Sequence, residues 1–287
     1  MLVKFAHLIY LILVLIDKFI KIFAKQFHFI LFLKEYIENK SYKLQNIAGN
    51  KVKFFIPNKS VNLRVERIFS NEPETIEWID NFENNKDTIF WDIGSNIGLF
   101  SIYASCKHKN IKTFSFEPST SNLRVLSRNV SINNLQDRIL INQFPLSVHE
   151  NSYLLFNETR FQEGSSNSTF GEDFGYDGKK ILSKNSYKIF GNSINNLINN
   201  KILDIPDYIK IDVDGIEHLI LEGANKYLSD KKIKSILVEV NEEFEEQLSK
   251  VNKILLNNDF KLISKNKRDD QVVSKFMGQR NYIFIKI

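Results

Sequence analysis

A carboxylate and two glycines stand together in the segment FWDIGSNIG, where an apolar run ends at Asp92 and is followed by Gly94 and Gly98. Glycine lets the backbone turn tightly and lets a ligand approach it closely, and a helix start offers unpaired N–H groups. A pyrophosphate-binding turn has the spacing G-x-G-x-x-G, and one of its glycines is missing here. With Asp92 beside it, this turn suits a cationic or hydroxyl-bearing ligand better than a pyrophosphate.

A second acidic residue, Glu117, ends the next apolar run, FSFE, 25 residues after Asp92. An acidic side chain at the end of the second strand of an α/β unit can accept hydrogen bonds from both hydroxyls of a ribose. The glycine turn alone is a weak signal, but the two motifs together are considerably more specific. We therefore expect a ribose-containing ligand at this edge of the sheet.

Three further carboxylates fall within six residues of the segment YIKIDVDGIE, at Asp212, Asp214 and Glu217. Acidic residues at a helix start are common because of the helix dipole, and this explanation serves Asp214 and Glu217 equally well. Asp212 differs because it belongs to the apolar strand itself, where a carboxylate without a partner is costly to bury. A fourth carboxylate, Glu239, ends the apolar run ILVEVN in the same manner.

These residues require a framework of alternating strands and helices. The apolar pattern predicts strands at 88–93, 112–116, 139–142, 208–213, 235–240, 259–263 and 282–287. Helical spacing predicts helices at 98–105, 119–134, 216–227 and 243–257. Such alternation is typical of an α/β domain whose mainly parallel sheet is covered by helices on both faces.

The chain before this framework has a different pattern. We expect residues 41–87 to hold a hairpin at 51–69 and a helix at 73–85, leading into a domain of residues 88–287. Within that domain, the polar and glycine-rich stretch 158–186 predicts a long surface loop beside the acceptor side of a site.

Four segments, FWDIGSNIGLFS, FSFEPSTSNLRVLSRNVSINN, YIKIDVDGIEHLILEGA and ILVEVNEEF, resemble in this order the FkbM family of methyltransferases. The resemblance covers residues 60–287 and implies a Rossmann-like class I fold with a seven-stranded sheet. It also implies S-adenosylmethionine as methyl donor and a hydroxyl oxygen of a glycan or small metabolite as the usual acceptor. It assigns donor binding to Asp92, Gly94, Asn96, Gly98 and Glu117.

The resemblance also places Asp212 and Glu217 in the family's acidic cluster, where Asp214 stands in place of the more common Glu. A hydroxyl loses a proton as it attacks a methyl group, so a general base assists the reaction. We expect Asp212 to be that base, with His218 as the second candidate, although a lone helical histidine is more often structural. A hard-cation site is an alternative that we do not favour, with oxygen ligands from Asp212, Asp214, Glu217 and Glu239.

Two other functions remain open from the sequence. A similar fold serves NAD(P)-dependent oxidoreductases, but the missing glycine and the nearby Asp92 count against a pyrophosphate site. A non-catalytic, membrane-associated binding domain would keep the fold without the chemistry, and the presence of Asp92, Glu117 and Asp212 counts against it.

The N-terminal 40 residues are both apolar and basic, and we expect them to be helical. Residues 5–16 contain no Asp, Glu, Lys or Arg, but this run is shorter than the roughly 20 apolar residues that span a bilayer. Lys18, Lys21 and Lys25 follow at a spacing that puts them on one helical face.

Three interpretations of residues 1–40 remain open. An interfacial helix would make peripheral membrane contact through residues 1–33. A second possibility is a helix packed on the main domain or on another subunit. The sequence does not indicate how many subunits the protein has. A signal peptide is the third, but no small-residue cleavage pattern follows the apolar run.

The net charge and the cysteine content indicate which binding partners and which cellular compartment to expect. Residues 1–40 hold six lysines and three acidic residues, a net charge of +3 out of +5 for the whole chain. The remainder is nearly neutral, without the broad basic face that nucleic-acid binding requires, so we expect no nucleic-acid partner. The single cysteine, Cys106, is expected to be a small buried residue and suits a reducing compartment. We expect a cytoplasmic protein, in contact with the inner face of the membrane if residues 1–33 bind lipid.

Overall fold

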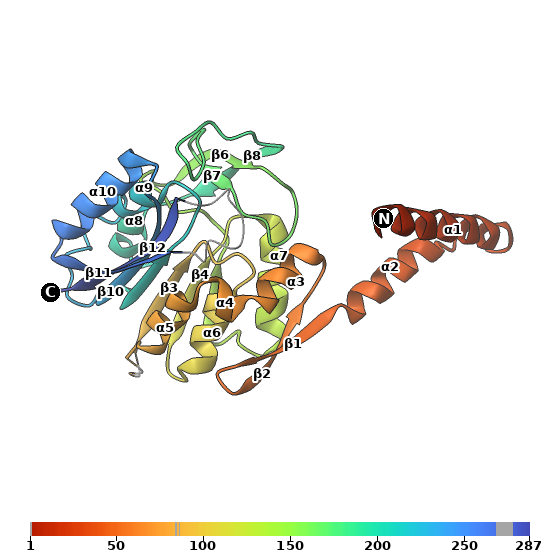
Figure 1. The fold of residues 1–287 in the computed structure, drawn as a ribbon, viewed down its shortest axis with the longest axis horizontal. Helices are drawn as coiled ribbons and strands as arrows, with labels where there is room; N and C mark the ends of the chain where they lie inside the picture. Colours follow the sequence, from red (N-terminus) through yellow and green to blue (C-terminus); the bar gives the residue numbers. More distant parts are fainter. Residues whose placement is uncertain (1, 84, 86, 268–277) are drawn as a thin grey trace.

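A seven-stranded sheet forms the centre of the computed structural model, which describes residues 2–83, 85, 87–267 and 278–287 (Figure 1). Its strands are β3 (Ile89–Ile93), β4 (Lys112–Phe116), β5 (Ile139–Asn142), β9 (Tyr208–Ile211), β10 (Ser235–Asn241), β11 (Phe260–Lys267) and β12 (Gln279–Lys286). They lie in the order β11-β12-β10-β9-β3-β4-β5, and β12 is antiparallel to both of its neighbours. The five strands from β10 to β5 are parallel, so the predicted mainly parallel, seven-stranded sheet is confirmed.

Helices cover both faces of this sheet, as the alternation of elements predicted. One face carries α5 (Pro73–Asp80), α6 (Leu99–Lys107) and α7 (Thr120–Ile132), and the other carries α8 (Ile194–Asn199), α9 (Glu217–Glu222) and α10 (Glu245–Leu256). Successive residues of a strand point to opposite faces. On β3, Phe90 therefore joins the apolar cluster under α6 and α7, whereas Trp91 joins the cluster under α8 to α10. By the same alternation, Asp92 points to the α6 side.

A small antiparallel sheet is inserted between β5 and α8. It consists of β6 (Ser152–Glu158), β7 (Ser168–Phe170) and β8 (Asn185–Gly191). The stretch expected as a surface loop, 158–186, is therefore interrupted by β7, which pairs with β6. Burial alternates regularly along β6 and β8, yet the strands of this small sheet were not recognised in the sequence, nor was α8.

The predicted hairpin at 51–69 is wrong. The hairpin lies earlier, where β1 (Tyr42–Ile47) pairs with β2 (Asn50–Phe55), and residues 59–71 form α3 (Lys59–Glu66) and α4 (Ile68–Asn71). Asn58 starts α3 by accepting a hydrogen bond from the Val61 N–H, and Val61 and Val65 bury one helical face. The second apolar run therefore forms a helix, although its apolar residues are also spaced as in a strand. Cys106, at the end of α6, is half-buried.

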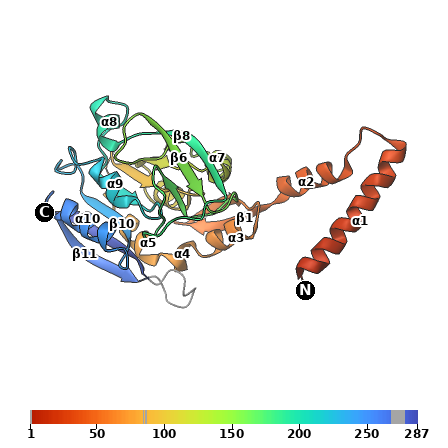
Figure 2. The same ribbon diagram turned by 90° about the horizontal axis from the view of Figure 1, so that it is seen from above.

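The N-terminus forms a helical hairpin that projects away from the α/β domain (Figures 1 and 2). It comprises α1 (Leu2–Phe23) and α2 (Phe29–Lys40), and we call residues 2–40 the arm. Glu38 attaches the base of the arm to α7 through ion pairs with Arg124 and Arg128. Among the helices that the structure describes, none combines the length and the apolar character needed to cross a membrane.

Candidate active site

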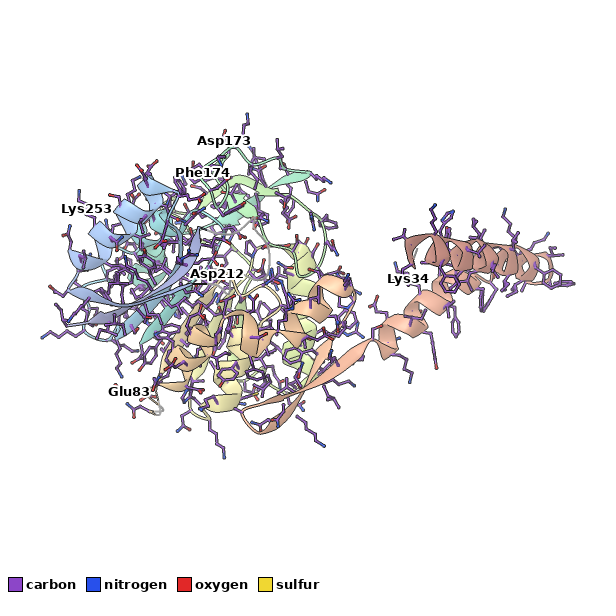
Figure 3. The ribbon with its side chains drawn as sticks, in the orientation of Figure 1. Lys34, Glu83, Asp173, Phe174, Asp212 and Lys253 are labelled. Atoms are coloured by element: carbon purple, nitrogen blue, oxygen red, sulfur yellow. The ribbon has the colours of Figure 1, made fainter. Side chains whose placement is uncertain are left out.

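A cavity of about 560 Å³ opens at the carboxyl edge of the parallel strands. The residues after β3, β4 and β9 form the floor of the cavity. The small sheet, together with the loop that precedes β7, covers it, and α3 and α4 close one side. Figure 3 shows Asp212, one of its wall residues, near the middle of the α/β domain. The general rule for open α/β sheets, that ligands bind at the carboxyl ends of the strands, is thus met.

The turn after β3 is held between the two neighbouring strands. The N–H groups of Gly94 and Ser95 both donate to the Phe116 carbonyl at 3.0 Å. Gly94 has a φ of +83°, and a Cβ at this position would lie 1.8 Å from the Asp212 carbonyl oxygen. Only glycine allows the ends of β3 and β9 to approach this closely, which places the turn beside Asp212.

Glu117 is a buried carboxylate on the cavity wall, immediately after β4. Its two oxygens accept hydrogen bonds from the Asn96 and Ser119 N–H groups, each at 2.8 Å. Burial raises the pKa of Glu117 to about 8, against these two hydrogen bonds, which lower it. A carboxylate has about four acceptor positions, so Glu117 retains the capacity to accept further hydrogen bonds from hydroxyl groups.

Asp92 lies behind the cavity wall and not on it. Its carboxylate is fully buried and accepts a hydrogen bond from the Ser101 hydroxyl at 2.5 Å, and Ser101 in turn contacts Ser115 at 2.6 Å. Burial raises the pKa of Asp92, whereas the nearby Lys210 ammonium lowers it. The hydrogen bonds therefore connect Asp92 to α6 and, through Ser101, to Ser115 on β4.

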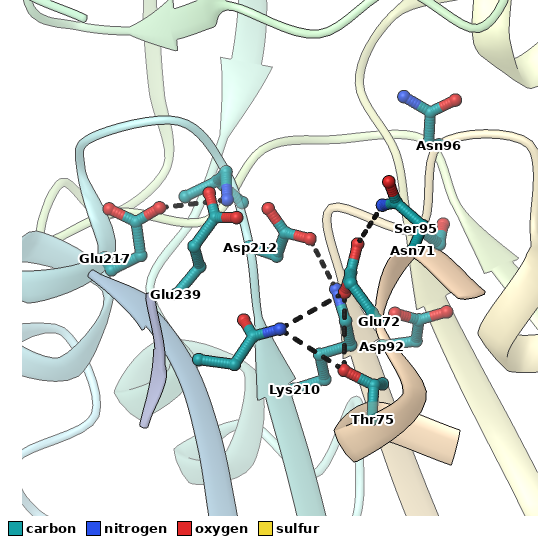
Figure 4. Close-up of polar contacts among 12 residues, drawn as sticks. Asn71, Glu72, Thr75, Asp92, Ser95, Asn96, Lys210, Asp212, Glu217 and Glu239 are labelled. Atoms are coloured by element: carbon teal, nitrogen blue, oxygen red, sulfur yellow. Dashed lines mark hydrogen bonds and ion pairs between the residues drawn. The ribbon is translucent and has the colours of Figure 1, made fainter. Parts of the chain in front are cut away.

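A buried ion pair links Lys210 to Asp212. The Lys210 ammonium lies 2.7 Å from Asp212 Oδ2 (Figure 4), and the lysine side chain is 1% exposed, against 20% for the aspartate. Burial alone would lower the pKa of Lys210, but the carboxylates of Asp212, Glu72 and Asp92 outweigh it and raise the pKa. An ammonium at this distance stabilises the carboxylate form of Asp212, which stands on the cavity wall.

The remaining acidic residues of this segment have different surroundings. Glu217 is buried outside the cavity wall and accepts hydrogen bonds from the Val213 and Gly215 N–H groups, so it shapes the turn after β9. Burial raises the pKa of Glu217 to about 7. Asp214 lies on the wall and accepts a hydrogen bond from the Asn167 N–H at 2.7 Å.

His218 also lies outside the cavity wall. Its ring packs against Phe174 and Phe244, with ring centroids 6.3 and 6.0 Å away. Burial lowers its pKa and so favours the neutral ring. Of the residues expected from the sequence, the structure brings Gly94, Asn96, Glu117 and Asp212 together on the wall. Asp92, Gly98 and His218 lie behind it.

Glu239 also lies on the cavity wall, and the Gln279 amide donates to it at 3.0 Å. The hard-cation alternative would need Glu217 as well, but that side chain is directed at backbone N–H groups. Within the described residues, no three His, Cys, Asp or Glu side chains form a group that could hold a metal ion.

Several wall residues had no clear signal in the sequence. Arg64 and Glu72 come from α3 and from the residue after α4, a region that precedes the α/β framework. Gln279 belongs to the final strand. Lys210 is not on the wall, but its sequence does carry a signal, because a lysine inside the apolar strand YIKI needs an acidic partner and Asp212 stands two residues away.

A family model described as a methyltransferase FkbM domain matches residues 92–262. No curated protein matches the chain. Similar solved structures include precorrin-6y C5,15-methyltransferase from Geobacter metallireducens GS-15, with 13% identity, a TM-score of 0.43, and 75% of this chain and 87% of that chain covered. M. jannaschii TYW2 in complex with AdoMet has 13% identity, a TM-score of 0.42 and coverages of 86% and 87%. The Methanococcus jannaschii fibrillarin pre-rRNA processing protein has 12% identity, a TM-score of 0.44 and coverages of 85% and 82%.

Proposed function

This chain belongs to the FkbM family of S-adenosylmethionine-dependent methyltransferases, and we propose that it O-methylates a hydroxyl group on a glycan or a small metabolite. The observation that carries the proposal is the position of Asp212. Its carboxylate stands on the cavity wall, paired with a buried ammonium and adjacent to the Gly94 turn. A base in this position can take the proton of an acceptor hydroxyl that enters the cavity.

The cavity residues fit the methyl donor. In this proposal, Glu117 accepts hydrogen bonds from the ribose hydroxyls, and Asn96 and Gly94 border the donor through the turn. Phe116 and Phe144 supply apolar wall for an adenine ring. Asp92 and Gly98 then act from behind the wall by shaping the turn. Bound S-adenosylmethionine would supply an electrophilic methyl group on a sulfonium that is already a good leaving group.

Asp212 is the general base of the proposed reaction, in preference to His218. The acceptor hydroxyl gives its proton to the Asp212 carboxylate as its oxygen attacks the methyl carbon. Lys210 positions this carboxylate through their ion pair, and the Phe100 ring packs over the ammonium, with its centroid 5.0 Å away. The His218 ring packs against Phe174 and Phe244 and does not line the cavity.

The acceptor side of the cavity is polar, which favours a hydroxyl-rich molecule. Its wall combines side chains that donate and accept hydrogen bonds: Arg64, Asn71, Glu72, Ser166, Glu239 and Gln279. A few convergent polar groups of this kind fix the orientation of a ligand in an otherwise apolar pocket. This composition supports a glycan or a polyhydroxylated metabolite over an aromatic acceptor.

We also propose a cytoplasmic location at the inner face of a membrane and no nucleic-acid partner. The single cysteine suits a reducing compartment, and the chain outside residues 1–40 is nearly neutral. Residues 1–33 would make the membrane contact.

Calorimetric titration tests donor binding first. S-adenosylmethionine and NADH are titrated separately into the wild type and into Glu117→Gln. We expect heat from the methyl donor only. Above pH 8, where Glu117 is ionised, the variant should bind the donor at least tenfold more weakly, because a carboxylate accepts both ribose hydroxyls better than an amide. Binding of NADH instead would replace the proposal with an oxidoreductase, and donor binding without turnover on any acceptor would favour a binding domain.

The chemistry of the product tests O-methylation of a hydroxyl. Acceptor candidates are incubated with methyl-labelled donor, and the labelled product is treated with alkali and analysed by mass spectrometry. A methyl ether survives this treatment, whereas a methyl ester is hydrolysed. Label that is released by alkali, or that is found on nitrogen or carbon, would contradict the proposal.

A further inference from the structure

The arm exposes an unusual amount of apolar surface. More than half of the large apolar side chains that are exposed among the described residues belong to it. Leu2 and Val3 are each 83% exposed, and Phe19 is 62% exposed. Exposed apolar patches of this size on an otherwise ordinary domain mark an interaction surface.

The apolar surface of α1 extends around the helix. The consecutive residues 8–12 (LIYLI) are all exposed, and successive helical residues point about 100° apart. They therefore face every direction, and α2 diverges from α1 beyond the turn that connects the two helices (Figure 2). A coiled-coil partner would need only a narrow apolar seam. A helix that is apolar on nearly all sides instead suits a surrounding that can cover several sides at once, such as lipid.

The charges of the arm complement an anionic surface. Its exposed lysines are Lys4, Lys18, Lys25, Lys34 and Lys40. Two of its three acidic residues are engaged in ion pairs, Asp17 with Lys21 at 2.8 Å and Glu38 with Arg124 and Arg128. The charge that the arm presents outward is therefore positive, which is the sign that attracts anionic headgroups.

We propose that the arm is a membrane-binding hairpin, with α1 lying in the interface of a bilayer that contains anionic phospholipid. Lys4 and Lys18 bracket the uncharged residues 5–16, which extend about 18 Å as a helix, short of the roughly 30 Å of hydrocarbon in a bilayer. Lying in the interface buries this segment and lets the lysine stems reach the headgroups at both of its ends.

Polar contacts within the arm hold its two helices together. Asp17 is 8% exposed, and it accepts a hydrogen bond from the Ile30 N–H at 3.3 Å in addition to its ion pair with Lys21. The Ile30 hydrogen bond joins the end of α1 to the start of α2 across the connecting turn, whereas the Lys21 ion pair lies within α1. The arm thus presents α1 at a defined angle and not as a loose tail.

The base of the arm is connected to the cavity loop. Arg124 on α7 pairs with Glu38 of the arm and, at 2.8 Å, with Glu163. The adjacent Gly164 carbonyl accepts a hydrogen bond from the cavity residue Arg64 at 2.7 Å. Membrane contact would therefore also hold the cavity in a fixed orientation to the bilayer. This last step rests on the proposed function, whereas lipid binding itself does not.

Flotation with vesicles tests the proposal. The full chain is mixed with vesicles of phosphatidylcholine alone or of phosphatidylcholine with phosphatidylglycerol. We expect the wild type to float with the mixed vesicles and much less with phosphatidylcholine. Leu11→Gln/Leu15→Gln should reduce partitioning by roughly tenfold or more, because two exposed apolar side chains are lost. Lys18→Glu/Lys25→Glu should remove most of the preference for the anionic vesicles.

Matched controls lie on the α/β domain. Leu182→Gln changes a side chain that is 84% exposed, and Lys188→Glu/Lys231→Glu makes the same change of net charge on exposed positions. Both should float like the wild type. Titration with S-adenosylmethionine in the same samples verifies the fold independently of the acceptor, so that a failed acceptor screen does not affect this result.

Two results would overturn the proposal. One is a folded, donor-binding wild type that does not float with the mixed vesicles. The other is a dimer in light scattering that Leu11→Gln/Leu15→Gln dissociates while vesicle binding is unaffected, because the apolar surface would then serve a second copy of the chain.

Discussion

The α/β domain and the arm depart from the ordinary distribution of polar and apolar residues in opposite directions. The domain buries charge, with Asp92 fully buried and Lys210 1% exposed. The arm exposes apolar side chains, with Leu2 and Val3 each 83% exposed. Both departures are unfavourable unless a partner offsets them.

The difference lies in where the partner is. In the domain, Lys210 is paired with Asp212 and lies among the carboxylates of Glu72 and Asp92, so the charges offset one another within the fold. In the arm, α1 meets α2 near their connecting turn and otherwise projects away from the domain (Figures 1 and 2). The domain therefore contains its own site, whereas the arm is a surface for something outside the chain.

The largest effect is expected from breaking the charge pair in the domain. Asp212→Asn should lower kcat by roughly 10²–10⁴, because the amide cannot accept the proton of the acceptor hydroxyl. Binding of S-adenosylmethionine should change little, and thermal unfolding should reveal some destabilisation because Lys210 loses its partner. The measurement is methyl transfer to the acceptor found by screening.

Glu222→Gln is the control for Asp212→Asn, since it removes a partly exposed carboxylate from α9. Its kcat should equal that of the wild type. Full turnover in Asp212→Asn would show that another group, or water, takes the proton of the acceptor.

A second prediction concerns the close approach of the ends of β3 and β9 at Gly94. Gly94 and Gly49 have nearly the same φ, +83° and +80°, but a Cβ at Gly94 would lie 1.8 Å from the Asp212 carbonyl oxygen and one at Gly49 would meet nothing within 4 Å. Gly49→Ala should therefore cost only the backbone strain, about 1–2 kcal/mol. Gly94→Ala should cost at least about 1–3 kcal/mol more, since β3 and β9 must separate.

Denaturant unfolding of the two variants measures this difference. Equal free energies of unfolding would mean that the turn after β3 relaxes freely. The site would then not depend on the close packing of the two strand ends.

The sheet could be predicted because each parallel core strand is a short, mainly apolar run that alternates along the chain with a helical pattern. Glu117 follows one of these strands, β4, and Asp212 follows another, β9, so both could be placed at the cavity. Parallel strands end at one edge, so residues that follow different strands meet there. The glycine pattern supplied the turn beside Asp212.

Other parts of the site could not be predicted, because their positions depend on tertiary packing. Glu72 follows a four-residue helix, and the sequence around it contains no periodic pattern that would direct it to the cavity. The predicted hairpin at 51–69 was wrong because the run SVNLRV contains apolar residues at positions compatible with both a strand and a helix. The Asn58 cap and the burial of Val61 and Val65 decide for the helix.

A smaller effect is expected from pH. Burial raises the pKa of Glu117 from its usual 4.5 to about 8, so the native state disfavours its ionised form. The stability that this group contributes is complete below pH 4.5 and is lost as the pH rises toward 8. The free energy of unfolding of the ligand-free protein should therefore fall over this range, and Glu117→Gln should reduce the fall.

Glu217→Gln provides the comparison for Glu117→Gln, because burial raises the pKa of Glu217 only to about 7. The change that Glu217→Gln makes in the pH dependence of the free energy of unfolding should end at a lower pH. Identical pH profiles for the wild type and Glu117→Gln would mean that Glu117 is already ionised across the range, through the N–H groups of Asn96 and Ser119.

The smallest effect is expected in the arm without lipid. Leu11→Gln/Leu15→Gln changes exposed side chains, so the free energy of unfolding should shift by less than about 0.5 kcal/mol. Leu126→Gln makes the same substitution on a fully buried residue of α7 and should cost several times more, because an amide is buried in an apolar cluster. Comparable destabilisation by both would mean that α1 packs against the domain in solution, and the contrast between the two regions would then disappear. Near-neutrality in solution combined with loss of vesicle binding would mean that α1 contributes binding and not folding, which is the division of roles that the exposed arm and the self-contained domain imply.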